Sequence, residues 1–300
     1  MMQNKTLPSS QSAQIIQGSI QHAHSHYENF PVASFLLPPD LRQPIALIYH
    51  FARQADDFAD EGSLSVAQRL HLLGQFKDEL DLLQAYIKPQ TPFFATLGGM
   101  IKRRKLPLAP FYALLDAFSQ DVVKTRYENY DEVLDYCQRS ANPIGQLLLH
   151  LYGAATPANL HYADNVCSAL QIINFLQDIA LDFEKNEGKK RIYLCQDELE
   201  AFGIDETVIA SYASKQSQAD ERWQGFMHFN LRRVSALLAS GKPLGRILQG
   251  RIGLEMRMII SGGECIINKI SHADGDVFNH RPTLNRWDWL MIFLKALIKR

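Results

Sequence analysis

The sequence predicts an all-α protein, and three observations point to this fold class. Apolar residues recur at the three- and four-residue spacing of helices along most of the chain. Runs with the two-residue alternation of β-strands are nearly absent. With 300 residues, 46% of them hydrophobic, the chain can bury a large core. Because no internal repeat or low-complexity linker divides it, we expect a disordered tail over residues 1–20 and one helical domain over 21–300.

The first helix is expected over residues 40–61, after Pro38-Pro39 and with Asp40 in the N-cap position. Its buried face is predicted by apolar residues at helical spacing: Ile45, Ile48, Ala52, Ala55 and Ala59. Further apolar-periodic runs predict helices over 65–87, 108–123, 131–152, 159–184, 205–239 and 244–271. Glycine and proline mark the breaks at Gly62, Pro89 to Pro92, Pro107, Pro157, Gly188 and Gly241 to Pro243.

The overall charge excludes several classes of function. The chain has 31 basic and 32 acidic residues, a net charge of −1, so we expect no binding of nucleic acid. Its four cysteines are scattered without the spacing of zinc ligands or of a disulfide framework: Cys137, Cys167, Cys195 and Cys265. The first twenty residues are polar and have no apolar signal core, which predicts a cytoplasmic protein.

Two pairs of aspartates carry most of the functional information. Asp56 and Asp60 are four residues apart, and so are Asp178 and Asp182. On a helix, each pair projects from one face about one turn apart, where like charges repel. Hard divalent cations such as Mg²⁺ take carboxylate and phosphate oxygens, so two such helices facing each other across a central cavity would hold a Mg²⁺-bound diphosphate.

The alternative interpretation of each pair is a solvated helix surface, which is the more common origin of a single acidic pair. The neighbouring residues argue against it. Arg53 and Tyr49 share the helix face of Asp56. Gln171 and Asn174 lead into the second pair along one polar face of an otherwise apolar helix. Such a stripe is unfavourable unless it lines a cavity or binds a ligand.

The residues around both pairs resemble the squalene and phytoene synthase family. Residues 49–60 are similar to its first aspartate-rich motif, and residues 171–183, followed by Arg191-Ile192-Tyr193, are similar to its second. The likeness extends from His26 to Arg281. It implies an all-α isoprenoid synthase fold with a central active-site cavity, in which Mg²⁺ between the two motifs binds a prenyl diphosphate and promotes its ionisation to a carbocation.

The resemblance, with the chemistry of carboxylates and cations, assigns roles to individual residues. Metal ligation is expected from four aspartates, which also count as catalytic, and one amide: Asp56, Asp60, Asp178, Asp182 and Asn174. Diphosphate binding is expected from cationic and hydrogen-bonding side chains: Arg53, Tyr49, Gln171, Arg191, Lys190 and His26.

Within the family, the chain is most similar to the members that act in hopanoid biosynthesis, through residues 27–34, 140–145 and 262–264. It departs from the wider family at Tyr27, Asn29, Asn142 and Gly263. The implied reaction is ionisation of presqualene diphosphate and capture of the rearranged cation by water, without NADPH. Asn142 is expected to be catalytic by holding that water. Functional links to a presqualene diphosphate synthase and to a squalene-forming oxidoreductase are also implied.

Two other functions stay open. The chain resembles phytoene and squalene synthases that condense two prenyl diphosphates themselves, and the same fold occurs in a non-catalytic assembly factor of respiratory complex I whose aspartate motifs are degraded. Both motifs are intact here, which favours an enzyme. A G-x-G-x-x-G motif is absent, but the family's squalene synthases use NADPH without it.

A final helix is expected over residues 287–300. Trp287, Leu290, Phe293, Leu294 and Leu297 share one face, and charged residues stand opposite. Such a helix either packs on the domain or a partner, or lies on a membrane surface, at most as a peripheral contact with the inner face of the membrane.

Overall fold

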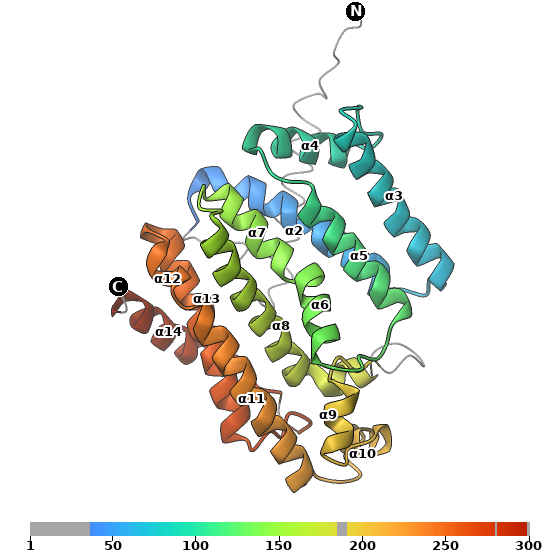
Figure 1. Ribbon diagram of the computed structural model, residues 1–300, viewed down its shortest axis with the longest axis vertical. Coiled ribbons are helices and arrows are strands. Elements are labelled where there is room, and N and C mark those ends of the chain that lie inside the picture. The colour runs from blue at the N-terminus through green and yellow to red at the C-terminus, as the bar shows by residue number, and fades with distance from the viewer. Residues whose placement is uncertain (1–36, 185–190, 280, 299–300) are drawn as a thin grey trace, which may run out of the picture. The chain divides into compact units, whose positions relative to one another are not determined.

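A computed structural model describes residues 37–184, 191–279 and 281–298 (Figure 1). Within these ranges the chain forms helices and no strand, and an isolated bridge pairs Tyr127 with Cys195. The helices are α2 (Pro39–Asp60), α3 (Val66–Gln84), α4 (Pro92–Arg104), α5 (Ala109–Val123), α6 (Tyr130–Ser140), α7 (Asn142–Leu151), α8 (Pro157–Glu184), α9 (Gln196–Ala201), α10 (Glu206–Ala213), α11 (Glu221–Gly241), α12 (Leu244–Ile247), α13 (Gly250–His272) and α14 (Arg286–Ile298). The prediction of an all-α fold is confirmed.

The start of α2 differs from the prediction. The helix begins at Pro39, its N-cap is Pro38, and no side chain caps it, so the prediction that Asp40 is the N-cap was wrong. Proline has no N–H to satisfy and a φ already suited to the first helical position, which moves the start ahead of Asp40. Asp40 instead lies in the first turn, where its negative charge interacts favourably with the helix dipole.

Three of the predicted runs are each two helices. Residues 131–152 break at Ala141, 205–239 at 214–220, and 244–271 at Leu248-Gln249. The first break precedes Pro143, which has no N–H for the helix ladder and whose ring crowds the preceding turn. The helices α4 and α9 were not predicted. Helix α9 has only 6 residues, too few for apolar periodicity to be recognised.

By their internal contacts the residues form two compact units. The first unit comprises the chain up to Val123 together with Gln146–Ala155, and the second comprises Lys124–Gly145 and Thr156–Arg300. The prediction of a single domain over 21–300 stays a prediction, and the predicted tail over 1–20 lies outside the described residues.

An aromatic cluster forms the centre of the first unit. Phe51 of α2 is fully buried, and its ring lies 5.6 Å from that of Phe76, 6.0 Å from that of Phe94 and 5.1 Å from that of Phe111. These partners come from α3, α4 and α5, so one residue of α2 contacts three other helices. The rings meet mostly edge to face, the favourable arrangement for buried aromatic pairs. This packing fixes the buried face of the helix that carries the first aspartate pair.

In the second unit, α8 packs against α6, α10, α11, α12 and α13. Two glycines let α11 and α13 approach it closely. A Cβ added to Gly263 would lie 2.9 Å from Leu170 Cδ2 and 3.1 Å from Leu238 Cδ2, and one added to Gly241 would lie 2.8 Å from Tyr162 O. Helix packing therefore accounts for the glycine at 263, one of the departures from the wider family. By length and composition α8 could cross a membrane, but most of it is buried inside the fold, as in the core helix of a globular domain.

Candidate active site

The first aspartate pair lies on the half-buried side of α2. Arg53 forms three ion pairs there: Nη1 with Asp56 Oδ2 at 3.5 Å, Nε with Asp57 Oδ1 at 2.8 Å, and Nη2 with Glu61 Oε1 at 2.7 Å. Its partners stand three, four and eight residues further along the chain. Residues at these spacings lie one or two helical turns apart on the same face, which brings their charges close to Arg53. Tyr49, one turn before Arg53, is also half-buried.

The carboxyl group of Asp56 has a strongly raised pKa. Burial, together with the charges of Asp60, Asp121 and Asp57, raises the pKa of Asp56 to about 7, although Arg53 acts to lower it. The side chain nevertheless keeps 38% of its surface accessible, so water or a ligand can reach it. A carboxyl group surrounded by other carboxyl groups in this way has excess negative charge nearby, which a bound cation would neutralise.

Asp121 on α5 was missed by the sequence interpretation. It is only 4% exposed, yet its charge acts on Asp56 from another helix. In the sequence it ends an amphipathic run and has no partner at i+4 of its own type, so spacing gave no reason to select it. A buried carboxylate is unfavourable without compensation, which makes Asp121 a member of the first acidic cluster.

The second aspartate pair ends a polar stripe on α8. Gln171, Asn174, Asp178 and Asp182 are all half-buried, while the residues between them are mostly buried: Ile172, Ile173, Phe175, Leu176, Gln177 and Ile179. This matches the polar face expected from the three- and four-residue spacing. The stripe places two amides and two carboxylates, all of which offer oxygen ligands, within about three turns of helix.

Asp178 is held by a residue from far along the chain. Both of its oxygens bond Arg281, Oδ1 through Nε and Oδ2 through Nη2, the latter at 3.1 Å. The neighbouring buried amide of Gln177 donates to Pro282 O. These contacts tie the segment before α14 to α8, and the guanidinium supplies the positive charge that a cation would otherwise supply to Asp178.

Arg191 lies beside the second pair. Its N–H donates to Asp182 O at 3.2 Å, and its Nη1 donates to Tyr193 Oη at 2.9 Å. The guanidinium also lies over the Tyr193 ring, which stacks on Phe175 of α8 at 4.1 Å. The side chain is only 6% exposed. Arg191 is thus held next to Asp182, the place expected for a residue that binds diphosphate. The stacked rings of Tyr193 and Phe175 support its position.

Asn142 begins α7 and is only 3% exposed. Its Oδ1 accepts a hydrogen bond from Ser168 Oγ of α8 at 2.9 Å. This bond fixes the orientation of the amide and leaves its N–H₂ group as the part that could hold a water molecule. The predicted role of Asn142 in positioning water stays a prediction.

Several predicted residues lie outside the described part of the chain: His26 and Lys190 of the diphosphate-binding set, and Tyr27 and Asn29 among the departures. The two aspartate pairs belong to different units, so their facing each other also stays a prediction.

Each pair by itself fits a divalent cation. At the first pair, burial and the charge of Asp60 raise the pKa of Asp56. At the second, an arginine occupies both oxygens of Asp178. A proton on Asp56 and an arginine on Asp178 each supply the positive charge that a bound metal ion would supply. The donors are oxygens throughout, the set that suits Mg²⁺ rather than a soft metal.

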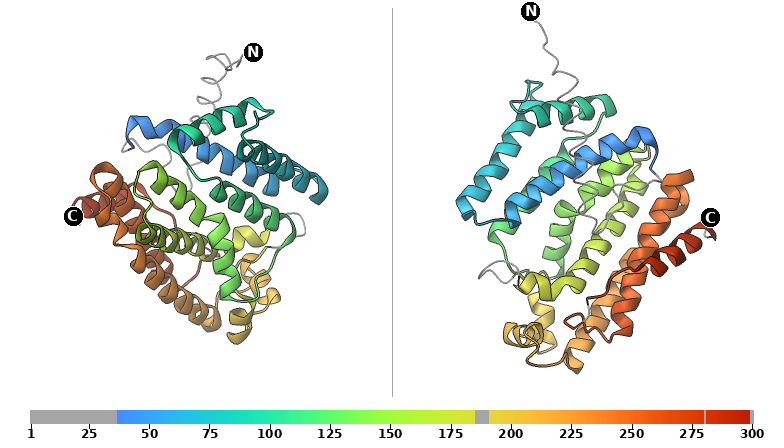
Figure 2. Two further views of the ribbon diagram at one scale, coloured as in Figure 1. Left: turned by 45° about the horizontal axis from the view of Figure 1, so that its top comes forward. Right: turned by 180° about the vertical axis from the view of Figure 1, so that it is seen from behind.

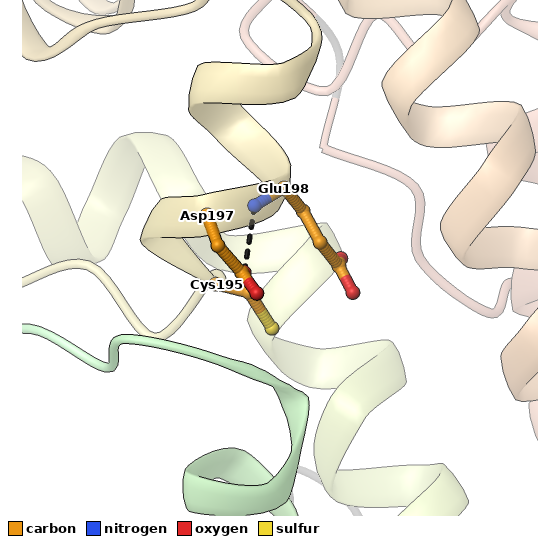
Figure 3. Close-up of side chains that lie close together, drawn as sticks. All are labelled: Cys195, Asp197 and Glu198. Carbon is orange, nitrogen blue, oxygen red and sulfur yellow. Dashed lines mark hydrogen bonds between the residues drawn. The ribbon is translucent and has the colours of Figure 1, made fainter.

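A different cluster of ligand-type atoms fails the same test. Cys195, Asp197 and Glu198 lie within 4.8 Å of one another at the start of α9 (Figure 3). Burial raises the pKa of the Cys195 thiol to about 12, so it is not a thiolate at neutral pH. Glu198 is paired with Arg233 through both oxygens. This cluster is structural.

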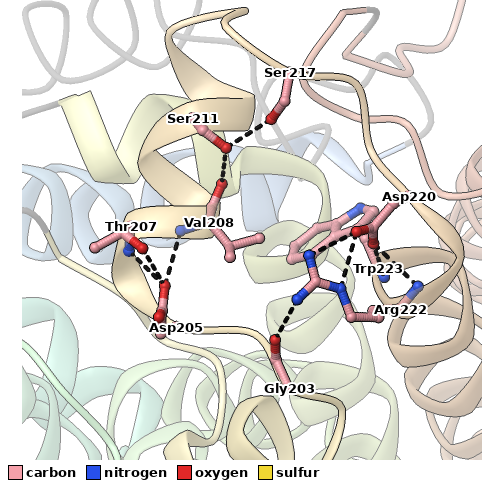
Figure 4. Close-up of polar contacts among 9 residues, drawn as sticks. All are labelled: Gly203, Asp205, Thr207, Val208, Ser211, Ser217, Asp220, Arg222 and Trp223. Atoms are coloured by element: carbon pink, nitrogen blue, oxygen red, sulfur yellow. Dashed lines mark hydrogen bonds and ion pairs between the residues drawn. The ribbon is translucent and has the colours of Figure 1, made fainter.

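The polar residues around α10 and the start of α11 are structural as well (Figure 4). Asp205 accepts from the N–H groups of Thr207 and Val208, and Asp220 accepts from those of Arg222 and Trp223. Both aspartates cap helix N-termini, where they satisfy free backbone donors.

Comparison with known proteins identifies the family. The squalene/phytoene synthase family profile matches residues 23–288. A hydroxysqualene synthase from Rhodopseudomonas palustris is 34% identical over 248 residues, 82% of this chain and 80% of its own length. A phytoene synthase from Arthrospira platensis is 26% identical over 281 residues, 91% of this chain and 89% of its own. The crystal structure of squalene synthase HpnC from Alicyclobacillus acidocaldarius is similar with a TM-score of 0.78 and 29% identity, covering 89% of this chain and 97% of that one.

The chain therefore belongs to the squalene/phytoene synthase family, a family of enzymes that act on prenyl diphosphates and generally use a divalent metal. The resemblance expected from the two aspartate motifs is confirmed.

Proposed function

We propose that this protein is a hydroxysqualene synthase, a carbon–oxygen lyase that ionises presqualene diphosphate with the help of Mg²⁺ and adds water to the rearranged cation. The products are hydroxysqualene and diphosphate. The observation that carries the proposal is the 34% identity to the Rhodopseudomonas palustris hydroxysqualene synthase over 82% of this chain. The carboxylate and arginine positions described above support it chemically.

Ionisation requires negative charge to be stabilised on the departing diphosphate. Mg²⁺, when bound, would neutralise that charge at the phosphate oxygens. The residues that would hold it are the two aspartate pairs and one nearby amide: Asp56, Asp60, Asp178, Asp182 and Asn174. Arg191 and Arg53 would bind the diphosphate, and the buried, ring-supported position of Arg191 suits a fixed two-pronged contact. Tyr49, Gln171, Lys190 and His26 would complete the diphosphate-binding set.

Water must then reach the cation before another nucleophile does. We assign this task to Asn142, whose amide is oriented by Ser168 and is otherwise enclosed. A water held by that amide would attack the cationic carbon through its oxygen and lose one proton to solvent, so no reductant is consumed. This accounts for a reaction without NADPH.

The decisive experiment offers purified protein either presqualene diphosphate or farnesyl diphosphate with Mg²⁺, in ¹⁸O-labelled water, with and without NADPH. We expect presqualene diphosphate to give an ¹⁸O-labelled alcohol in the absence of NADPH. An unlabelled alcohol, or squalene formed only when NADPH is present, would contradict the proposal.

Substitution of Asn142 tests the water-holding step. We expect Asn142→Gly to shift the products from alcohol towards eliminated hydrocarbons, and Ser168→Ala to cause a smaller shift in the same direction because the amide loses its anchor. An unchanged product ratio in both folded variants would remove Asn142 from the mechanism.

The second candidate is a phytoene or squalene synthase that condenses two prenyl diphosphates. The similarity to the Arthrospira platensis phytoene synthase over 91% of this chain supports it. Consumption of farnesyl diphosphate alone would favour this candidate. For the proposed function, the substrate must come from an enzyme that joins two farnesyl groups, and the alcohol must pass to an oxidoreductase that forms squalene.

A further inference from the structure

The outer face of α14 is apolar. Six large hydrophobic side chains of this helix are exposed, from 44% for Leu294 to 83% for Ile298, and the others are Trp287, Leu290, Met291 and Leu297. They recur at spacings of three and four residues, so they form one stripe along the helix. Scattered exposed hydrophobic residues are normal, but a continuous stripe that includes a 76% exposed tryptophan marks an interaction surface.

This face does not arise from a poorly packed helix. The opposite side of α14 buries Ile292 and Ala296 against the unit. Asp288 pairs with Lys269 of α13 at 2.5 Å, and Arg257 Nε donates to Ala296 O at 2.8 Å. The helix is therefore held at both ends, and its rotation about its own axis is fixed with the stripe outward. The apolar face formed by residues 287, 290, 294 and 297 therefore meets solvent rather than the core.

The end of α14 is joined to α12. Arg257 also donates to Gly245 O at 2.7 Å, so one guanidinium bonds both helices. The right view of Figure 2 shows α14 lying beside α13, which carries Arg257. Ile247 of α12 is 44% exposed. We call Ile247 and the six exposed residues of α14 the apolar surface.

The charges around the apolar surface are mainly positive. Four exposed basic side chains lie on α12, the start of α13 and α14: Arg246, Arg251, Arg286 and Lys295. The acidic residues of the same segments are compensated or enclosed, since Asp288 is paired with Lys269 and Glu255 is only 6% exposed. This concentration of positive charge occurs in a chain whose net charge is −1.

We propose that α14 docks flat on a bilayer containing anionic lipid, with the apolar surface inserted at the level of the headgroups. An amphipathic helix with leucine and tryptophan on one side and basic residues at its margins binds in this way. Tryptophan favours the interface because its ring is apolar and its N–H polar. The basic margin complements anionic headgroups, each nearby charge strengthening the binding, and this favours lipid over a second copy of the chain.

The proposal also connects the membrane with the second aspartate pair. Asn285 Oδ1 caps α14 through the N–H groups of Trp287 and Asp288, both at 2.9 Å. Four residues earlier, Arg281 binds Asp178. Docking of α14 would hold this segment of the chain at the lipid surface, where an apolar diphosphate ester resides. The docking itself does not depend on which prenyl diphosphate is the substrate.

Co-sedimentation with vesicles tests the proposal in the absence of substrate. We expect the full chain to bind vesicles of phosphatidylcholine with phosphatidylglycerol, to bind pure phosphatidylcholine less, and to lose binding as salt is raised. Leu290→Ser with Leu294→Ser should weaken the partition at least about tenfold. Arg246→Gln with Arg251→Gln should weaken it about fivefold per charge at low salt.

The matched control is Leu64→Ser with Leu70→Ser, which makes the same change at two leucines of similar exposure, 38% and 37%, that belong to the first unit. It should bind vesicles as the unchanged protein does, and melting temperatures should be compared for all variants. Retention of the unchanged protein in the supernatant with anionic vesicles would overturn the proposal. So would equal losses in the two leucine pairs, or dimers that dissociate only when the α14 leucines are replaced.

Discussion

The two aspartate pairs differ in where their positive partner comes from. On α2, Arg53 pairs with Asp56 and Asp57, three and four residues away in the same helix. On α8, Asp178 pairs with Arg281, 103 residues further along the chain. The first arrangement is a property of one helix, and the second exists only when the segment before α14 is packed on α8.

The difference has consequences for charge. Arg53 is shared among three carboxylates and leaves Asp56 with a pKa raised to about 7, whereas Arg281 faces Asp178 with both oxygens engaged. We infer that the first pair can bind a proton or a metal ion without losing a protein partner. At the second pair, Arg281 must leave Asp178 before a metal ion can bind there. The predictions below test this contrast.

The largest effect should come from removing one carboxylate of either pair. We expect Asp56→Ala and Asp178→Ala each to lower turnover of presqualene diphosphate by at least about 10³-fold, because a lost metal ligand removes several kcal/mol of transition-state stabilisation. Single-turnover assays at limiting Mg²⁺ measure it. Asp135→Ala, a carboxylate on exposed α6 surface, is the control. A near-normal rate in either variant would exclude that pair from metal binding.

Arg191 should have the next largest effect. We expect Arg191→Ala to lower turnover about 10²-fold and Arg191→Lys to lower it less, since lysine keeps the charge but not the planar fork that contacts diphosphate. Because the side chain is buried, circular dichroism and melting temperature must show that each variant is folded. Equal activity of all three proteins would make Arg191 a structural residue that supports Tyr193.

Arg281 tests the exchange at the second pair. We expect Arg281→Gln to bind Mn²⁺ about fivefold more tightly in the absence of substrate, because a partly exposed ion pair contributes up to about 1 kcal/mol and no longer competes. Titration calorimetry of the metal-free protein measures this affinity. Arg286→Gln, which removes the same charge five residues later, should leave it unchanged. Weaker binding in Arg281→Gln would show that this arginine supports the metal site instead.

The smallest effect concerns pH and the first pair. Between about pH 4 and pH 7, native Asp56 keeps a proton that the unfolded chain has already released, so stability falls as pH rises through this window. Because the side chain is 38% exposed, we expect only about 1 kcal/mol, or about 2–4 °C in melting temperature. Asp56→Asn should lose this part of the pH dependence. Parallel melting curves for both proteins across the window would contradict the raised pKa.

The sequence determined the features that depend on near neighbours along the chain. A four-residue spacing places two carboxylates on one helix face wherever the helix lies, so Asp56 with Asp60 and Asp178 with Asp182 could be recognised directly. The same holds for Arg53, whose partners all stand within eight residues. Apolar periodicity likewise located the long helices, because burial of one face imposes a repeat of about 3.6 residues.

Tertiary structure alone decided the features that join distant residues. Asp121 acts on Asp56 from another helix, Arg281 reaches Asp178 across 103 residues, and the N–H of Arg191 returns to Asp182. Tertiary structure also decided that the apolar stripe of α14 faces solvent. Ile292 and Ala296, on the other side of the helix, are apolar as well, and they are the residues that the fold buries. These outcomes follow from which helix faces pack together, and packing depends on the shapes of all the surrounding side chains rather than on any local spacing.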